Sequence, residues 1–406
     1  MSAPRATRVA QTALAPRGTI EALAGFFALA LAMGVGRFAY TPMLPPMLDQ
    51  SSLSLSGAGF VASANFAGYL FGALLATRSY VARRRVLWLR VGLAATILTT
   101  AAMAIDAGAW SWAFIRFVAG AASAFVLVFA SAVVFAAAAR EGRPMLGALL
   151  YAGVGLGIVT STMLIDFGRD AGWSFSLLWI SLAGLALLFA LAPWRELDAP
   201  PPPPAPAPSP SSAGTSMRRR ELDRLVWSYG CLGFGYVITA TFVVVIARSL
   251  PDARSVEFWT WMIVGIVGSP SNWFWTRVAQ RIGVYRAIVV AFVLEAIGVA
   301  LVAVGQHAIA LYVGAALLGG TFMAITALGL AQARSLAPDR PDETIARMTV
   351  AFSTGQIIGP AIAGWMADRS GSFVAPSWIA AAVLLVGAGL AAAASTSTKA
   401  TAPPGG

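Results

Sequence analysis

The sequence has 406 residues, of which 58% are hydrophobic and only 11% are charged, and its mean hydropathy is +0.75. Because soluble proteins average about 25% charged residues, this composition excludes a soluble globular domain. The net charge is +11, and the single cysteine, Cys231, and single histidine, His307, exclude a disulfide framework and a His/Cys metal cluster, so we expect no metal and no cofactor.

Twelve stretches are apolar enough to cross a membrane, which takes roughly 20 residues each. The first six cover 18–46, 57–77, 86–105, 109–139, 145–166 and 173–193. The second six cover 224–247, 256–277, 286–304, 308–333, 345–367 and 374–395. The sequence therefore predicts an all-α integral membrane protein of twelve transmembrane helices in two six-helix bundles.

The predicted bundles cover 18–194 and 223–396, with tails at 1–17 and 397–406. The segment between them, 195–222, contains prolines 200–204 and is expected to be an extended, solvated linker. Most of the 28 basic residues fall in the tails, the linker and alternate loops, and this bias predicts that both termini are cytoplasmic. The positive charge thus follows from membrane topology, and we expect the lipid bilayer, and no nucleic acid, as a partner.

The two halves of the sequence resemble each other at an offset of about 200 residues. Residues 34–37, Gly-Val-Gly-Arg, correspond to residues 233–236, Gly-Phe-Gly-Tyr, and residues 116–120 correspond to residues 316–320. Twofold repeats of apolar helices are typical of secondary transporters. The comparison sets Arg37 against Tyr236, so the two halves differ in charge at this position.

Three motifs point to a known family. After the eighth predicted span, Arg281, Gly283 and Arg286 stand in a segment that resembles the cytoplasmic loop motif of the major facilitator superfamily, without the acidic residue of that motif. The Arg-x-x-x-Gly pattern at 116–120 is similar to a motif of the superfamily's proton antiporters. The first-helix sequence at 36–45, GRFAYTPMLP, is similar to a poorly characterised bacterial branch related to proton-driven efflux permeases.

This resemblance implies a secondary active transporter in a bacterial inner (plasma) membrane. Its implied partners are a small-molecule solute and protons, and the resemblance favours alternating access, proton coupling and efflux over uptake. It implies no enzymatic activity, and we expect a monomer. Because the loop motif is degenerate, an alternative stays open: a transport-inactive membrane sensor or binding protein on the same fold.

Two arginines, Arg37 and Arg116, fall inside predicted spans. An arginine at the centre of a bilayer costs at least ~2.5–3.5 kcal/mol, so each is expected to face a cavity or a partner. The resemblance places their helices, the first and fourth, beside the central cavity. Each can bind solute or pair structurally with backbone carbonyls. The two alternatives are balanced for Arg116, and the structural one is favoured for Arg37, which lies nearer the outer end.

Other polar side chains in the spans are candidates for solute contact, coupling or bonds between the halves. They are Tyr40, Tyr151, Tyr236, Asn65, Gln356 and Glu295. Glu295 is a possible proton carrier, and we expect it to bond to the helix over 256–277 or 374–395. No acidic residue falls in the middle of a predicted cavity helix, which favours an anionic or neutral solute.

Glycines on the fifth and eleventh predicted spans have two interpretations. Small residues let helices approach closely in lipid, so the first is tight packing. The second is a sliding gate between these two spans, which we expect to face each other across the halves. The residues concerned are Gly153, Gly157, Gly355, Gly359 and Pro360, the last three of which resemble the Gly-x-x-x-Gly-Pro motif of the antiporters.

Overall fold

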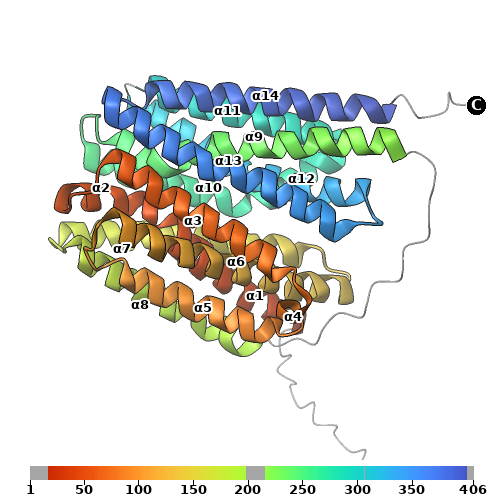
Figure 1. The fold of residues 1–406 in the computed structure, drawn as a ribbon, viewed down its shortest axis with the longest axis horizontal. Coiled ribbons are helices and arrows are strands. Elements are labelled where there is room, and N and C mark those ends of the chain that lie inside the picture. The colour runs from red at the N-terminus through yellow and green to blue at the C-terminus, as the bar shows by residue number, and fades with distance from the viewer. Residues whose placement is uncertain (1–16, 198–214, 306, 400–406) are drawn as a thin grey trace, which may run out of the picture.

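The computed structural model describes residues 17–197, 215–305 and 307–399, and the regular elements within these ranges are helices (Figure 1). The predicted tails at 1–17 and 397–406 lie almost entirely outside the described residues, as does most of the linker predicted at 195–222. The last part of that linker is helical, because the first helix of the second half already begins at Thr215.

The helices follow the predicted spans closely. The first half contains α1 (Arg17–Leu29), η1 (Ala30–Phe38), α2 (Tyr40–Gln50), α3 (Leu55–Ala76), α4 (Ser79–Ala82), α5 (Arg85–Ala102), α6 (Gly108–Arg140), α7 (Met145–Asp170) and α8 (Phe175–Glu196). The second half contains α9 (Thr215–Ala247), α10 (Ala253–Ile282), α11 (Val284–Val304), α12 (Ala308–Leu336), α13 (Pro341–Ser370) and α14 (Val374–Lys399). Ten helical segments are long and apolar enough to cross a membrane, counting Arg17–Gln50 as one. Helices α10 and α13, of 30 residues each, are not among the ten.

The first predicted span is not a simple α-helix, because its middle nine residues, Ala30–Phe38, form the π-helix η1. In a π-helix the N–H of residue i+5 donates to the carbonyl of residue i. The partner of the Arg37 carbonyl in this pattern is position 42, which is a proline and has no N–H. The π pattern therefore cannot continue past Arg37, and the helix returns to the α form in α2.

The two halves meet mainly along two pairs of helices, with a smaller contact between α2 and α9. Helix α3 packs against α13, which lies beside it in Figure 1, and α7 packs against α10. The expectation that the fifth and eleventh spans (α7 and α13) face each other across the halves is wrong, since each packs against a different helix of the opposite half. The remaining large contacts join helices of the same half, such as α3 with α6 and α9 with α14.

The glycines singled out from the sequence pack within their own half. Gly153 and Gly157 lie against the backbone of α1 and η1, and Gly355 and Gly359 lie against α9. A methyl group at Gly153 would meet the carbonyl of Phe26. This geometry is what the packing interpretation expects.

Different glycines lie where the halves meet. Gly59 of α3 has the carbonyl of Pro360 where a side chain would stand, and Gly155 of α7 has Gly265 and Ser269 of α10. The first contact joins α3 to α13 and the second joins α7 to α10, and neither leaves room for a Cβ atom. Of the five residues that the sequence suggested for a gate, Pro360 is therefore the one that lies between the halves.

The predicted loop motif lies at the junction of α10 and α11. Gly283 has a φ of 90°, a left-handed conformation that favours glycine, and no heavy atom lies within 4 Å of the position of a Cβ. Glycine is therefore required here by the backbone and not by crowding. Arg281 and Arg286 beside it are exposed.

Candidate functional site

A small cavity of about 20 Å³ lies between the two halves. This volume suits about one water molecule. Its lining comes from η1, α2, α3 and α6 of the first half and α9 of the second, and includes Arg37, Tyr40, Thr41, Phe66, Arg116 and Thr241. The cavity therefore lies where solute-binding groups were expected, with both sequence-predicted arginines in its wall.

Arg116 is tied to the backbone of the first helical segment. Its Nη1 donates to the carbonyl of Gly36 at 2.7 Å and its Nη2 to the carbonyl of Arg37 at 3.0 Å. The side chain is 3% exposed, and its Cζ lies 5.0 Å from the centre of the Tyr40 ring. These are the carbonyls at the point where the π-helix ends, and Arg116 supplies the Arg37 carbonyl with a donor that Pro42 cannot. This geometry agrees with the structural role considered for Arg116, in which the side chain pairs with backbone carbonyls.

Arg37 has the opposite character. It is 5% exposed, yet its Nε and Nη2 have no hydrogen-bond partner among the described residues. Its Cζ lies 4.5 Å from the centre of the Phe66 ring and 4.6 Å from that of Tyr69. The sequence favoured a structural role for Arg37, and the structure disagrees. The two adjacent N–H donors without a partner, Nε and Nη2, belong to Arg37 and not to Arg116. Tyr69 was not a candidate from sequence, although it follows Phe66 by one helical turn.

Tyr236 of α9 precedes the lining residue Val237 but is not itself part of the cavity lining. Its ring stacks between those of Phe322 and Phe352, at centroid distances of 5.3 and 5.8 Å, and its hydroxyl accepts a hydrogen bond from Nε2 of Gln356. Arg37 and Tyr236 are close enough to interact electrostatically, but of this repeat-related pair only Arg37 lines the cavity.

The other two tyrosine candidates lie apart from Tyr236. Tyr40 lines the cavity and donates to the carbonyl of Ala58 at 3.1 Å. Tyr151 is not in the cavity lining and packs against Phe135 at a centroid distance of 6.3 Å. The structure therefore brings Tyr40 to the site and leaves Tyr151 outside it.

The amide candidates do not bond between the halves, contrary to expectation. Asn65 of α3 donates to the carbonyl of Arg116 on α6 at 2.9 Å, and Gln356 of α13 bonds to α9. Both bonds remain within one half. A bond that does cross comes from Thr41, whose hydroxyl donates to the carbonyl of Ala240 at 2.6 Å.

Glu295 of α11 is completely buried and accepts a hydrogen bond at 2.9 Å from Thr321. Thr321 belongs to α12, so the expectation of a partner on α10 or α14 is wrong. The second carboxyl oxygen of Glu295, Oε1, has no partner within the described part of the chain. Glu295 is also close enough to Tyr236 to interact with it electrostatically.

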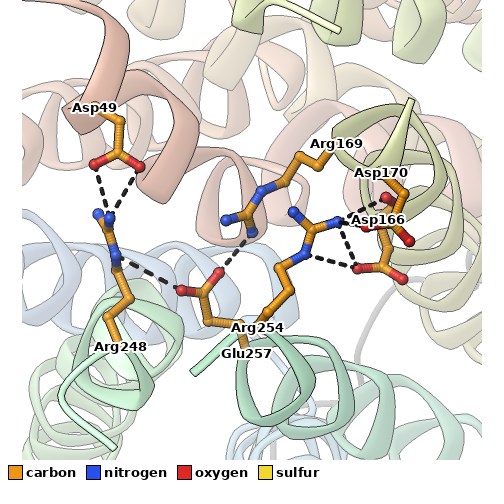
Figure 2. A network of polar contacts seen from close by, with 7 residues as sticks. All are labelled: Asp49, Asp166, Arg169, Asp170, Arg248, Arg254 and Glu257. Carbon is orange, nitrogen blue, oxygen red and sulfur yellow. Dashed lines mark hydrogen bonds and ion pairs between the residues drawn. The ribbon is translucent and has the colours of Figure 1, made fainter. Parts of the chain in front are cut away.

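Ion pairs between the halves form a network that the sequence reasoning missed (Figure 2). Arg169 of α7 pairs with Glu257 of α10 at 2.6 Å, and Asp49 of α2 pairs with Arg248 at 2.7 Å. Arg248 also approaches Glu257 at 3.6 Å. We call the end of the molecule that carries these residues the Glu257 end. The charges were assigned to loops from the sequence, yet the Glu257 side chain is only 5% exposed.

Arg254 extends the network at the same end. It pairs with Asp166 at 3.1 Å and with Asp170 at 2.7 Å, again joining α10 to α7 (Figure 2). Nearby, Ser56 of α3 donates to Asp368 of α13 at 2.7 Å. Both helix pairs that join the halves are thus linked by polar side chains at this end.

The opposite end differs. There the ion pairs between described residues join helices of one half, as in Arg140 with Glu21 at 2.7 Å and Arg347 with Asp223. The halves are therefore held together by charge at the Glu257 end and not, among these pairs, at the other.

These features define a multi-pass helical membrane protein with a polar site enclosed between two halves. Residues 29–392 match the family described as "Uncharacterised MFS-type transporter YbfB", and the chain belongs to this family of major facilitator superfamily transporters. The predicted membership is thereby confirmed.

Solved structures of the same fold include the nucleoside transporter NupG. The chain superposes on it with a TM-score of 0.67 and 15% sequence identity, covering 94% of this chain and 99% of NupG. A mutant form of NupG gives a TM-score of 0.65 and 13% identity with the same coverage. At this identity the likeness concerns the fold. No curated protein matches the sequence. The comparisons give no support to the transport-inactive alternative.

Proposed function

We propose that this protein is a proton-coupled secondary active transporter that moves a small anionic or neutral solute by alternating access, outward rather than inward. It acts as a monomer without enzymatic activity, in the inner membrane of a bacterium. Twelve spans form two six-helix bundles, over 18–194 and 223–396, and the linker and both termini are cytoplasmic. The resemblance of residues 116–120 to the antiporter motif supports efflux.

The network at the Glu257 end is the observation that carries this proposal. It joins the bundles at the Glu257 end, where the ion pairs between described residues cross from one bundle to the other, so the described conformation is closed at that end. The basic bias of the sequence assigns the Glu257 end to the outer face. Opening then requires the pairs of Arg169, Arg248 and Arg254 with the opposite bundle to break, while the bundles close at the cytoplasmic end.

We expect Glu257→Gln to open the outer end. The substitution weakens the contacts of Glu257 with Arg169 and Arg248, and a shift of about 1.4 kcal/mol changes the open population about tenfold. The measurement is the labelling rate of Thr241→Cys, which lines the cavity, by a membrane-impermeant thiol reagent added outside, with Cys231→Ala as background. Labelling should rise about tenfold. Glu343→Gln, which removes an exposed ion pair with Arg340 at the opposite end, should leave it unchanged.

An equal labelling rate in Glu257→Gln and in its parent would contradict the assignment of this network as the outer gate. Equal increases in Glu257→Gln and Glu343→Gln would contradict it too, because a general loosening of the fold would then explain the labelling.

For proton coupling, the proposed carrier is Glu295. It is completely buried, and one of its carboxyl oxygens has no hydrogen-bond partner among the described residues. A carboxyl inside a membrane bundle is expensive to retain and is commonly part of a proton path. Through Tyr236 its charge can act on the central site.

We expect Glu295→Gln to remove the pH dependence of the conformational equilibrium, because the amide cannot titrate. In the Thr241→Cys labelling assay the rate should differ between acidic and neutral pH in the parent and be equal in the variant. Glu196→Gln, at an exposed acid on α8, should keep the parental pH dependence. The same pH dependence in Glu295→Gln and the parent would exclude Glu295 as the carrier.

A further inference from the structure

Arg37, a buried cation in the cavity wall, has one edge of its guanidinium without hydrogen-bond partners among the described residues. Nε and Nη2 of Arg37 are adjacent donors on one side of the guanidinium, and both lack a hydrogen-bond partner among the described residues. This pair of N–H groups matches the two oxygens of a carboxylate in bidentate geometry. Arg116 does not offer such a pair, because its Nη1 and Nη2 are already bonded to backbone carbonyls and only its Nε is free.

Among the described residues, Arg37 has no ion-pair partner. None of the residues that line the cavity is acidic, and Glu295, the buried acid that acts on Tyr236, is bonded to Thr321. The Cζ atom of Arg37 lies over the rings of Phe66 and Tyr69, and these contacts leave Nε and Nη2 without a hydrogen-bond partner among the described residues. An unpaired buried guanidinium is costly, and an anionic ligand would remove that cost.

The rest of the lining restricts what the anion carries. Phe38, Ala62, Val237 and Ala240 give an apolar wall, and Thr241 adds a hydroxyl. One free bidentate edge satisfies one carboxylate, and the lining has no second cation with two free donors for a second anionic group. From this we infer that the site binds an organic monocarboxylate with an apolar body, its carboxylate on Nε and Nη2 of Arg37.

The present cavity of about 20 Å³ holds about one water and no such solute. The ligand therefore enters only when the two bundles move apart around Arg37. The inference rests on the proposed function for this movement, while binding itself is measured without transport.

Binding is tested on the purified full-length chain by thermal unfolding, followed through tryptophan fluorescence, at constant ionic strength. The probes are benzoate and hexanoate, their uncharged partners benzamide and hexanamide, the cation benzylamine, and the inorganic anions chloride and phosphate. We expect both carboxylates to raise the unfolding temperature and the amides, benzylamine and inorganic anions to leave it unchanged. Arg37→Gln should weaken benzoate binding at least about tenfold, since it loses charge-assisted hydrogen bonds.

Arg37→Lys provides a second variant that keeps the charge but not the paired donors, and it should bind benzoate less tightly than the parent. Arg369→Gln is the matched control, because this exposed arginine also lies over an aromatic ring, 4.4 Å from the centre of Trp365. It should bind as the parent does. Equal shifts with benzoate and benzamide, equal shifts with benzoate and chloride, or unchanged benzoate binding in Arg37→Gln would each overturn the inference.

The outcome is separable from that of the proposed function. If the carboxylates do not bind but Glu257→Gln still raises the labelling of Thr241→Cys, the monocarboxylate site is wrong and alternating access stands. If the carboxylates bind and labelling does not respond, the site stands without the gate.

Discussion

Replacing Arg37 with methionine should abolish transport and at the same time raise the stability of the protein. The charge of Arg37 is buried and has no ionic partner among the described residues. Replacing buried charged groups by apolar residues of similar size is often neutral or stabilising by about 1–4 kcal/mol. The contacts with Phe66 and Tyr69 offset part of this gain, at about 0.5–2 kcal/mol each, and a methionine sulfur keeps a weaker contact with the same rings.

The net gain should be about 1 kcal/mol, measured as the free energy of unfolding or as the unfolding temperature of the purified protein. Uptake into proteoliposomes of the carboxylate that binds best is the second readout. A stabilised protein without transport identifies Arg37 as a residue kept for function at a cost in stability. A marked loss of stability in Arg37→Met would show instead that the arginine holds the fold together.

Replacing Arg116 with methionine should have the opposite effect on stability. The substitution leaves the carbonyls of Gly36 and Arg37 without their donors inside the protein. A buried carbonyl left unpaired costs about 1–3 kcal/mol, and the Arg37 carbonyl should be left so, which gives an expected loss of about 1–3 kcal/mol. The junction between η1 and α2 should loosen, because Pro42 cannot supply a replacement donor.

The measurement is again thermal unfolding, side by side with Arg37→Met. Arg116→Lys should recover part of the loss, since an ammonium group can donate to one of the two carbonyls. Equal stability of Arg116→Met and the parent would contradict the structural role of Arg116. Reduced transport in Arg116→Met is expected as well, so stability is the readout that separates the two arginines.

Much of the fold could be predicted from the sequence because lipid imposes strong constraints on composition. The span predicted at 109–139 became Gly108–Arg140, and that at 308–333 became Ala308–Leu336. The repeat also placed Arg37 against Tyr236, and these two side chains are close enough to interact electrostatically. Hydrophobicity and internal repetition thus indicated both the helices and the depth of the site.

What could not be predicted depends on hydrogen-bond register and on pairing between distant residues. Composition does not distinguish a π-helix from an α-helix, so η1 was not predicted. The hydrogen bonds from Arg116 to the carbonyls of Gly36 and Arg37 at the end of η1 were therefore not predicted either. The acids at the Glu257 end looked like ordinary loop charges, because Asp49 and Arg248 are 199 positions apart and nothing local marks them as partners. Arg37 and Arg116 are chemically identical, so only the contacts of each side chain in the folded protein show which one has free donors.

The central claim is that the two bundles rock about the Arg37 site, with the Glu257 end as the outer contact. The most direct measurement is a pair of spin-label distances across the two ends of the molecule. Labels at Ser52 and Ala375 report the Glu257 end, and labels at Arg78 and Gln280 report the opposite end; all four positions are exposed. The parent should show a short distance at the first pair.

Gly59→Ala places a methyl group against the carbonyl of Pro360 between the bundles, whereas Gly153→Ala places one against Phe26 within a bundle. The account predicts that Gly59→Ala lengthens the Ser52–Ala375 distance and shortens the Arg78–Gln280 distance together, and that Gly153→Ala changes neither. Distances that stay fixed at both ends in Gly59→Ala, or that lengthen at both ends, would contradict it.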